Sequence, residues 1–120
     1  MSFRGVGMHF NDMLTAINLV EEFVGPMDFA AYQADAKTRA AVERELQIIT
    51  EAAYRLKPED EALCPEPNWK ALRGMGNILR HAYHRVNDEA VWVTVKEDLP
   101  TLKAAVARAL AAISRSPLTG

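Results

Sequence analysis

The sequence predicts an all-α protein that folds as an antiparallel bundle of four to five helices. Apolar residues recur at intervals of three and four along most of the chain, which is the spacing of one face of a helix. Ala, Leu, Glu and Arg are abundant, whereas Gly and Pro number only six each, and this composition favours helices over strands. No segment shows the strict alternation of apolar and polar residues that is typical of a strand.

The first helix is predicted over His9–Val24, where the apolar stripe consists of Phe10, Met13, Leu14, Ile17, Val20 and Val24. Gly25-Pro26 should end it, because Pro cannot continue a helix and Gly tolerates the terminating conformation. A short helical turn over Met27–Tyr32 is expected next, with Asp28 as its N-cap.

The second long helix is predicted over Ala36–Leu56, with Asp35 as its N-cap and an apolar stripe formed by Val42, Leu46, Ile49, Ala53 and Leu56. Lys57-Pro58 should stop this helix, and the two prolines in Leu63–Asn68 indicate a connecting loop. A third helix is expected over Trp69–Tyr83, with Trp69, Leu72, Met75 and Leu79 facing the core.

The last helix is predicted over Glu89–Ile113, and Asn87 or Asp88 is its candidate cap. Its inward stripe includes Val91 or Trp92, Val95, Leu99, Leu102, Val106, Leu110 and Ile113. Pro100 lies inside this pattern, so a kink or break is expected near Lys96–Leu99. Four principal helices with short connections imply antiparallel packing, because each apolar stripe needs a partner.

Residues 1–120 are expected to form a single domain, with 1–8 and 114–120 flexible. No apolar run approaches the ~20 residues that span a bilayer, and Met1–His9 lacks the pattern of a signal peptide, so a cytoplasmic protein without membrane contact is expected. Cys64 is the only cysteine and cannot form an intramolecular disulfide; it is interpreted as a half-buried loop residue.

Charge is distributed unevenly along a chain whose net charge is −2. Between Asn68 and Val86 there is no acidic residue, yet six basic or titratable nitrogen side chains fall there: Lys70, Arg73, Arg80, Arg85, His81 and His84. A local positive patch on an acidic protein favours a specific anionic ligand such as phosphate over a general attraction to nucleic acid.

Gly74 and Gly76 lie inside the third predicted helix, where each costs about 1 kcal/mol relative to Ala. Such a cost usually reflects the close approach of another backbone or of a ligand. Polar side chains follow at intervals of three and four and therefore share one ridge of the helix: Arg73, Asn77, Arg80 or His81, and His84. One ligand could contact all of them.

This ridge carries cations, an amide and imidazoles without a carboxylate or thiolate, so no metal site and no cofactor is expected. The chemistry that suits His and Arg is metal-free phosphodiester cleavage. In such a reaction His removes the proton of a ribose 2′-hydroxyl or protonates the leaving oxygen, and Arg stabilises the charge that grows on phosphate. A ridge that serves only as an interface is the alternative interpretation.

From roughly Asn11 to Ile113 the sequence resembles the HepT-like proteins of the HEPN fold. The resemblance rests on several segments in the right order: 46–53 (LQIITEAA), Trp69, Gly74-Met75, 77–83 (NILRHAY), Val91-Trp92 and Asp98-Leu99-Pro100. It implies a HEPN helical bundle, usually a homodimer in which the motif helices of two subunits meet at a cleft.

The resemblance also implies a function: the toxin of a toxin–antitoxin pair, acting on RNA as a metal-independent ribonuclease. Its implied partner is a minimal nucleotidyltransferase antitoxin that inactivates the toxin by AMPylation, the addition of AMP to the motif tyrosine. Carried over to this sequence, His81 is the catalytic imidazole, Asn77 its polar neighbour and Tyr83 the site of modification.

One position departs from the family motif, which places an arginine where this chain has Gly76. Arg80 is the candidate for the missing cation, and Arg73, Gly76 and His84 are candidate supporting residues. The alternative function is a catalytically degenerate helical module that binds a nucleotide or the nucleotidyltransferase. Glu51 is a candidate ion-pair partner for Arg73 or Arg80, and Trp69 and Trp92 are expected in core or dimer packing.

Overall fold

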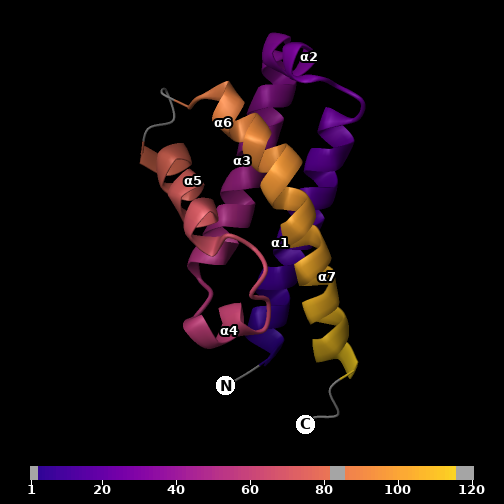
Figure 1. The fold of residues 1–120 in the computed structure, drawn as a ribbon, viewed down its shortest axis with the longest axis vertical. Helices are drawn as coiled ribbons and strands as arrows, with labels where there is room; N and C mark the ends of the chain where they lie inside the picture. The colour runs from indigo at the N-terminus through magenta and orange to yellow at the C-terminus, as the bar shows by residue number, and fades with distance from the viewer. Residues whose placement is uncertain (1–2, 82–85, 116–120) are drawn as a thin grey trace.

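The computed structural model describes residues 3–81 and 86–115, and every regular element within them is a helix, which confirms the all-α prediction (Figure 1). The chain runs up α1 (Phe3–Val24), down α3 (Ala36–Tyr54), up α5 (Trp69–His81) and down α7 (Leu99–Arg115). Helix α1 packs against α3 and α7, and α3 packs against α5. In the part of the chain so described, no helix combines the length and apolar character needed to cross a membrane.

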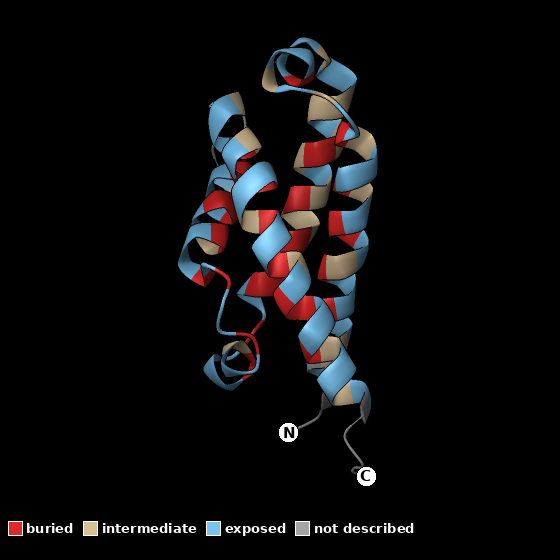
Figure 2. Ribbon diagram, turned by 45° about the vertical axis from the view of Figure 1, so that its right-hand side comes forward, coloured by how far each residue is buried: buried red, intermediate tan, exposed pale blue. Residues whose placement is uncertain are grey.

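The core lies along the inner faces of these helices (Figure 2). The stripes predicted from helical spacing are buried, with only Leu14, Leu110 and Ile113 partly exposed among their members. The fully buried side chains of largest volume come from the long helices and from the short α2 (Phe29–Ala34): Tyr32, Phe10, Met13, Ile17, Leu46, Ile49, Leu72 and Leu102. Periodicity alone therefore identified most of the core.

The two ends of α1 behave differently from each other. Its start at Phe3 precedes the predicted His9, because Gly5 and Gly7 weaken a helix without stopping it. Its end falls at the predicted place, since Gly25 adopts φ +50, a conformation that glycine reaches without steric cost. Asp28 caps α2 as predicted, by accepting the Ala31 N–H at 2.8 Å. Because the helix begins after its cap, it covers Phe29–Ala34 and not Met27–Tyr32.

The connection from α3 to α5 contains a helix that the sequence did not reveal. Helix α3 is capped as predicted, with Asp35 Oδ1 accepting the Thr38 N–H at 3.0 Å, and it ends at Tyr54 rather than Leu56. Pro58 both prevents continuation of α3 and opens α4 (Pro58–Ala62), because a first-turn residue needs no paired N–H. Asp60 stabilises this turn by accepting the Lys57 N–H at 2.9 Å.

The predicted break in the last helix is present as a π turn. Helix α6 (Asp88–Val93) is followed by η2 (Thr94–Asp98), in which the Leu99 N–H reaches the Thr94 carbonyl, and α7 then begins. Pro100 lacks an N–H, and its ring would collide with a carbonyl one turn earlier in a regular α-helix. The wider turn immediately before it accommodates the proline.

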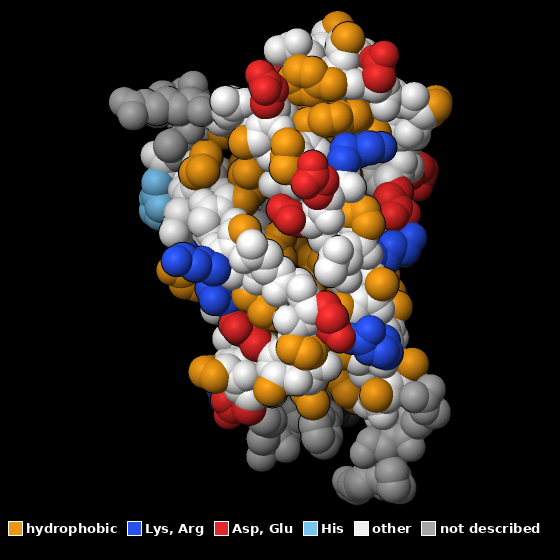
Figure 3. Space-filling view, viewed as in Figure 1, with side chains coloured by type: hydrophobic (Ala, Val, Ile, Leu, Met, Phe, Trp, Pro, Cys, Tyr) orange, Lys and Arg blue, Asp and Glu red, His pale blue; other side chains and the backbone are white. Residues whose placement is uncertain are grey.

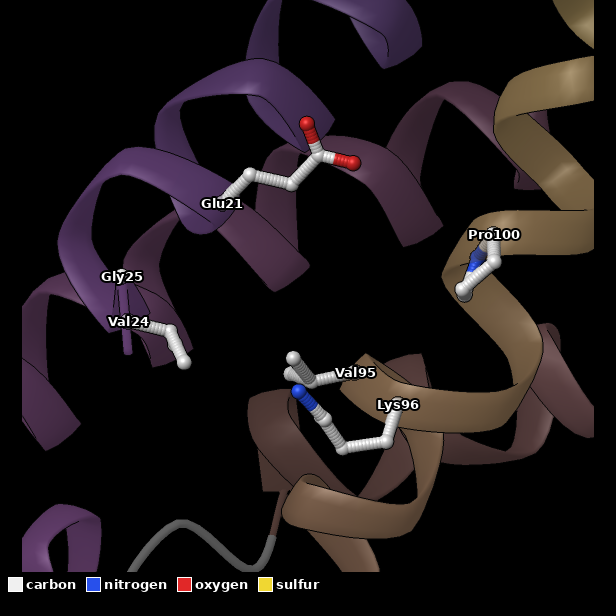
Figure 4. Close-up of a pocket in the computed structure, with 6 residues that line it drawn as sticks. All are labelled: Glu21, Val24, Gly25, Val95, Lys96 and Pro100. Carbon is white, nitrogen blue, oxygen red and sulfur yellow. The ribbon is translucent and has the colours of Figure 1, made fainter. Parts of the chain in front are cut away.

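A hollow of about 180 Å³ lies between the end of α1 and this π turn (Figure 4). It is lined by Glu21, Val24, Gly25, Val95, Lys96 and Pro100. Its charged groups already have protein partners: Glu21 accepts from Lys103 Nζ at 2.8 Å, and Lys96 Nζ lies 5.3 Å from the centre of the Trp92 ring. None of the side chains selected for chemistry in the sequence lines it.

Aromatic and charged side chains meet where α2, α3 and α6 converge. The Tyr32 ring packs 5.2 Å from that of Trp92, and its hydroxyl is buried with no hydrogen-bond partner among the described residues. Burial, and next the Glu43 and Asp88 carboxylates, raise the pKa of Tyr32. Burial likewise raises the pKa of Glu43, and the nearby Asp88 carboxylate adds to this shift while Arg39 opposes it.

Candidate functional site on helix α5

Gly76 lies where α5 crosses α3. A Cβ atom at this position would be 2.8 Å from Cβ and Oγ1 of Thr50, which is closer than such atoms approach. Thr50 is itself buried, and its hydroxyl donates to the Leu46 carbonyl at 2.9 Å. The prediction of a close approach is confirmed for Gly76. For Gly74, which is exposed, no described side chain or neighbouring helix lies within 4 Å of its Cβ position, so close approach of a ligand or of a second copy stays a prediction there.

The Arg80 guanidinium is held by two side chains, one from each of the packed helices. Its Nη2 donates to Asn77 Oδ1 at 2.9 Å, and its Cζ lies 4.7 Å from the centre of the Tyr54 ring. Side chains in a helix lean toward its N-terminus, so those of antiparallel α3 and α5 lean toward each other. This geometry lets Tyr54, at the end of α3, reach Arg80.

Arg73 has a different environment, although it shares a ridge with Asn77 and Arg80. Its Nη1 lies 2.5 Å from Glu61 Oε2 in a half-exposed ion pair that ties α4 to α5. The predicted pairing of Glu51 with Arg73 or Arg80 is therefore wrong, because α4 supplies the carboxylate for Arg73. Arg80 forms no ion pair with any residue that the structure describes. Of the two described arginines on this ridge, Arg80 is the one whose charge has no carboxylate beside it.

His81 is the last residue of α5 and is exposed. Within residues 3–81 and 86–115 it makes no hydrogen bond to Arg80 or Asn77. Arg80, the adjacent position, points about 100° away from it, whereas Asn77 lies one turn before it on the same face of the helix. Figure 3 shows Lys and Arg side chains and a histidine at the edge of the molecule formed by α5. The predicted site residues Tyr83 and His84 lie outside the described residues.

The sequence model of the family described as "Ribonuclease HepT-like" matches residues 13–109 of this chain. The chain belongs to the HepT-like family. The resemblance noted in the sequence is thereby confirmed.

Three relatives of this HepT-like chain illustrate the match. A protein of Thermococcus cleftensis named "Probable ribonuclease HepT" is 40% identical, over 79% of this chain and 86% of its own length. A Methanocaldococcus jannaschii protein named as a candidate RNase is 35% identical, over 86% of this chain and 94% of its own. A second such protein from the same organism is 30% identical, over 83% of each chain. No solved structure matches the chain significantly.

Tyr54 is the residue of this HepT-like site that the sequence reasoning missed. A signal for it existed: Tyr54 lies off the buried stripe formed by Ile49, Ala53 and Leu56, so its ring could not be a core group. What the sequence could not provide is its neighbour, because the contact with Arg80 depends on how α3 and α5 cross.

No group of three or more His, Cys, Asp or Glu side chains in the described ranges could hold a metal ion. Cys64 is fully buried, more than the half-buried position predicted, and burial raises the pKa of its thiol to about 11. The raised pKa keeps the thiol protonated at neutral pH, which disfavours a role as a nucleophile. Its carbonyl accepts the indole N–H of Trp69 at 2.9 Å, and Trp69 packs in the core, one of the two roles expected for it.

Proposed function

We propose that this HepT-like protein is a metal-independent endoribonuclease that cleaves RNA with side chains of α5. His81 acts as general acid or base, Arg80 stabilises the charge on the phosphate, and Asn77 orients the groups. The observation that carries the proposal is the Arg80 guanidinium, which is fixed by Asn77 and Tyr54 and has no carboxylate partner among the described residues. An unpaired, oriented guanidinium is suited to a phosphate oxygen.

The departure at Gly76 leaves this role to Arg80. Position 76 faces Thr50 and has no room for even a Cβ atom, so it does not present an arginine to a ligand here. Arg80 lies one turn further along the helix, and its side chain leans back toward the turn that contains Gly76 and Asn77. Arg80 would thus bring the positive charge of the family motif to the phosphate from the next turn of the helix.

The proposed cleavage of RNA uses the 2′-hydroxyl of the substrate as its nucleophile, and water is the only other reactant. A base removes the 2′-hydroxyl proton, the 2′-oxygen attacks phosphorus, and the bond to the 5′-oxygen breaks as that oxygen takes up a proton. The product carries a 2′,3′-cyclic phosphate, which water can open to a 3′-phosphate. His81 is placed at the exposed end of α5, where it can reach a bound polymer.

Two further parts of the proposal concern partners. The protein acts in the cytoplasm and as a homodimer. The reason for the dimer is that α5 exposes Gly74 and Ile78 beside the site, so a second copy of α5 would complete a cleft. It is the toxin of a pair whose antitoxin is a minimal nucleotidyltransferase that adds AMP to Tyr83. Arg73 then supports the site through its ion pair with Glu61, and His84 is the second supporting residue of the proposal.

The test is RNA cleavage and growth after induction of this chain alone, with and without a genomically neighbouring nucleotidyltransferase. Wild-type protein should inhibit growth and cleave RNA in the presence of a chelator, and His81→Ala should do neither. His9→Ala is the matched control, because His9 lies on α1 and should be dispensable. Undiminished cleavage by His81→Ala would contradict the assignment.

A second function, a catalytically degenerate module that binds a nucleotide or the nucleotidyltransferase, is favoured by one observation, the glycine at position 76. Under this alternative, soluble wild-type dimer leaves RNA intact at catalytic concentrations and still binds its partner. Arg80→Gln separates the two functions. It should lower the cleavage rate by orders of magnitude if Arg80 contacts the phosphate, and it changes no rate if the protein does not cleave RNA.

A further inference from the structure

We infer that the Tyr54 ring is a stacking platform for a nucleobase of single-stranded RNA, beside the phosphate that Arg80 contacts. The inference rests on the proposed function for the identity of the polymer. It adds a binding subsite on α3 to a site otherwise built from α5.

Tyr54 is placed unlike the other aromatic side chains. Among the aromatic residues whose burial the structure describes, Tyr54 alone is exposed, with 52% of its surface accessible. The others are either in the core or packed against it: Phe10, Tyr32, Trp69, Phe23, Phe29 and Trp92. Exposing a ring of this size forfeits burial energy, and Tyr54 is not among the described residues that pack on the core.

The ring and the guanidinium form one composite surface. Arg80 Cζ lies 4.7 Å from the ring centre, a distance at which the cation covers part of one ring face and is itself oriented by it. About half of the Tyr54 surface, 52%, remains accessible to solvent in the presence of this contact. A nucleotide has the matching parts, a flat base and an adjacent phosphate, so base stacking on Tyr54 and phosphate contact with Arg80 can occur together.

The orientation of the polymer follows from Arg80, the cation anchored beside the ring, although exposed Arg55 next to Tyr54 also carries a positive charge. Glu51 lies one turn before Tyr54 on α3 and would repel a phosphate on that side. Arg80 and its hydrogen-bond partner Asn77 lie on the α5 side. The phosphate therefore sits toward α5, and the base over α3. Stacking on an aromatic ring tolerates every base, so the platform contributes affinity for single strands and little sequence preference.

The test measures binding instead of cleavage, in a His81→Ala background that leaves the probe intact. The probe is a short, unstructured, fluorescein-labelled RNA, and the readout is fluorescence anisotropy. Tyr54→Leu should weaken binding by about tenfold or more, which is the usual scale of losing one base–aromatic stack. Tyr54→Phe keeps the ring and should bind within about twofold of the parent, and circular dichroism checks that each variant is folded.

An abasic oligonucleotide of the same length separates stacking from a purely structural role. If Tyr54 stacks on a base, Tyr54→Leu and the parent bind the abasic probe equally. Equal binding of intact RNA by Tyr54→Leu and Tyr54→Phe, or an equal loss on both probes, would overturn the inference. If Tyr54→Leu weakens binding of intact RNA only, but wild-type protein does not cleave RNA, the proposed function is contradicted and the stacking subsite is supported.

Discussion

Gly74 and Gly76 are neighbours on α5 with opposite surroundings. Gly76 presses against Thr50 across the α3–α5 contact, whereas the position of a Cβ on Gly74 is open. A glycine in the first setting is required by packing within the chain, whereas a glycine in the second weakens the helix of a single copy without relieving a clash inside it.

The two substitutions to alanine should therefore have opposite effects on the free energy of unfolding. Gly76→Ala forces Thr50 or the helices to move and should destabilise the protein by about 1–3 kcal/mol. Gly74→Ala removes the backbone entropy of glycine without a clash and should stabilise it by up to about 1 kcal/mol. Urea unfolding of both variants measures the difference, and an equal response would contradict the described crossing of α3 and α5.

Glu43 gives a prediction about pH. Its pKa is raised in the folded protein by burial and by Asp88, so folding favours its protonated form. The stability linked to this group is fully present below the pKa of an unfolded Glu and is lost as pH rises through the higher folded value. Glu43→Gln should consequently increase the resistance to urea at pH 7.5, and its advantage should shrink toward pH 4.5.

The matched control for this experiment is Glu45→Gln, two residues along the same helix and on a different face. It removes the same charge from the chain without changing the pair formed by Glu43 and Asp88. A gain that is equal in the two variants, or independent of pH, would mean that Glu43 is not responsible.

At the scale of elements, the ends of the helices show which boundaries the local sequence predicts and which it does not. Asp28 and Asp35 were predicted as caps, and Asn87 was one of two candidates beside Asp88; Asp28, Asp35 and Asn87 each accept a backbone N–H at the start of the helix. Helix α4 was missed because a proline was interpreted only as a stop, although the same residue can open a new helix. Capping is local chemistry, and a five-residue helix has too few positions to show periodicity.

Asn87 is the cap whose removal is easiest to interpret. Its Oδ1 accepts the N–H groups of Glu89 at 2.7 Å and Ala90 at 3.2 Å. Asn87→Ala should lower the free energy of unfolding by about 1 kcal/mol, and Asn87→Asp, which keeps the acceptor, should not. Chemical denaturation of the three proteins under one condition gives the comparison. Equal losses in both variants would show that the side chain acts by another route.

At the scale of the whole molecule, all-helical architecture and most core positions followed from residue spacing, because burial of one helix face leaves a periodic trace. The candidate site followed only in part. Asn77 and Arg80 were expected on one ridge, and the structure joins them. The Arg73–Glu61 pair and the Tyr54–Arg80 contact depend on which elements meet, and no pattern within one helix contains that information.

The proposed homodimer gives a prediction about exposed apolar side chains. Ile78 on α5 is 42% exposed and Val93 on α6 is 47% exposed, so they are comparable apolar side chains on different elements. If α5 forms the proposed dimer contact, Ile78→Lys should convert the protein to a monomer without unfolding it, and Val93→Lys should not. Sedimentation velocity at micromolar concentration measures whether each variant is a monomer or a dimer. A dimer that survives Ile78→Lys would place the contact elsewhere.

The reach of Arg80 has a consequence for how such proteins are compared. A motif search counts intervals between residues along the chain, but a bound phosphate encounters only the terminal nitrogens of a long side chain. Those of Arg80 are anchored at Asn77, three residues before their own Cα atom. If Arg80 takes the role of the motif arginine as proposed, two chains can differ at the motif position and still offer a cation to the same phosphate, and their sites are then best aligned by the positions of functional atoms.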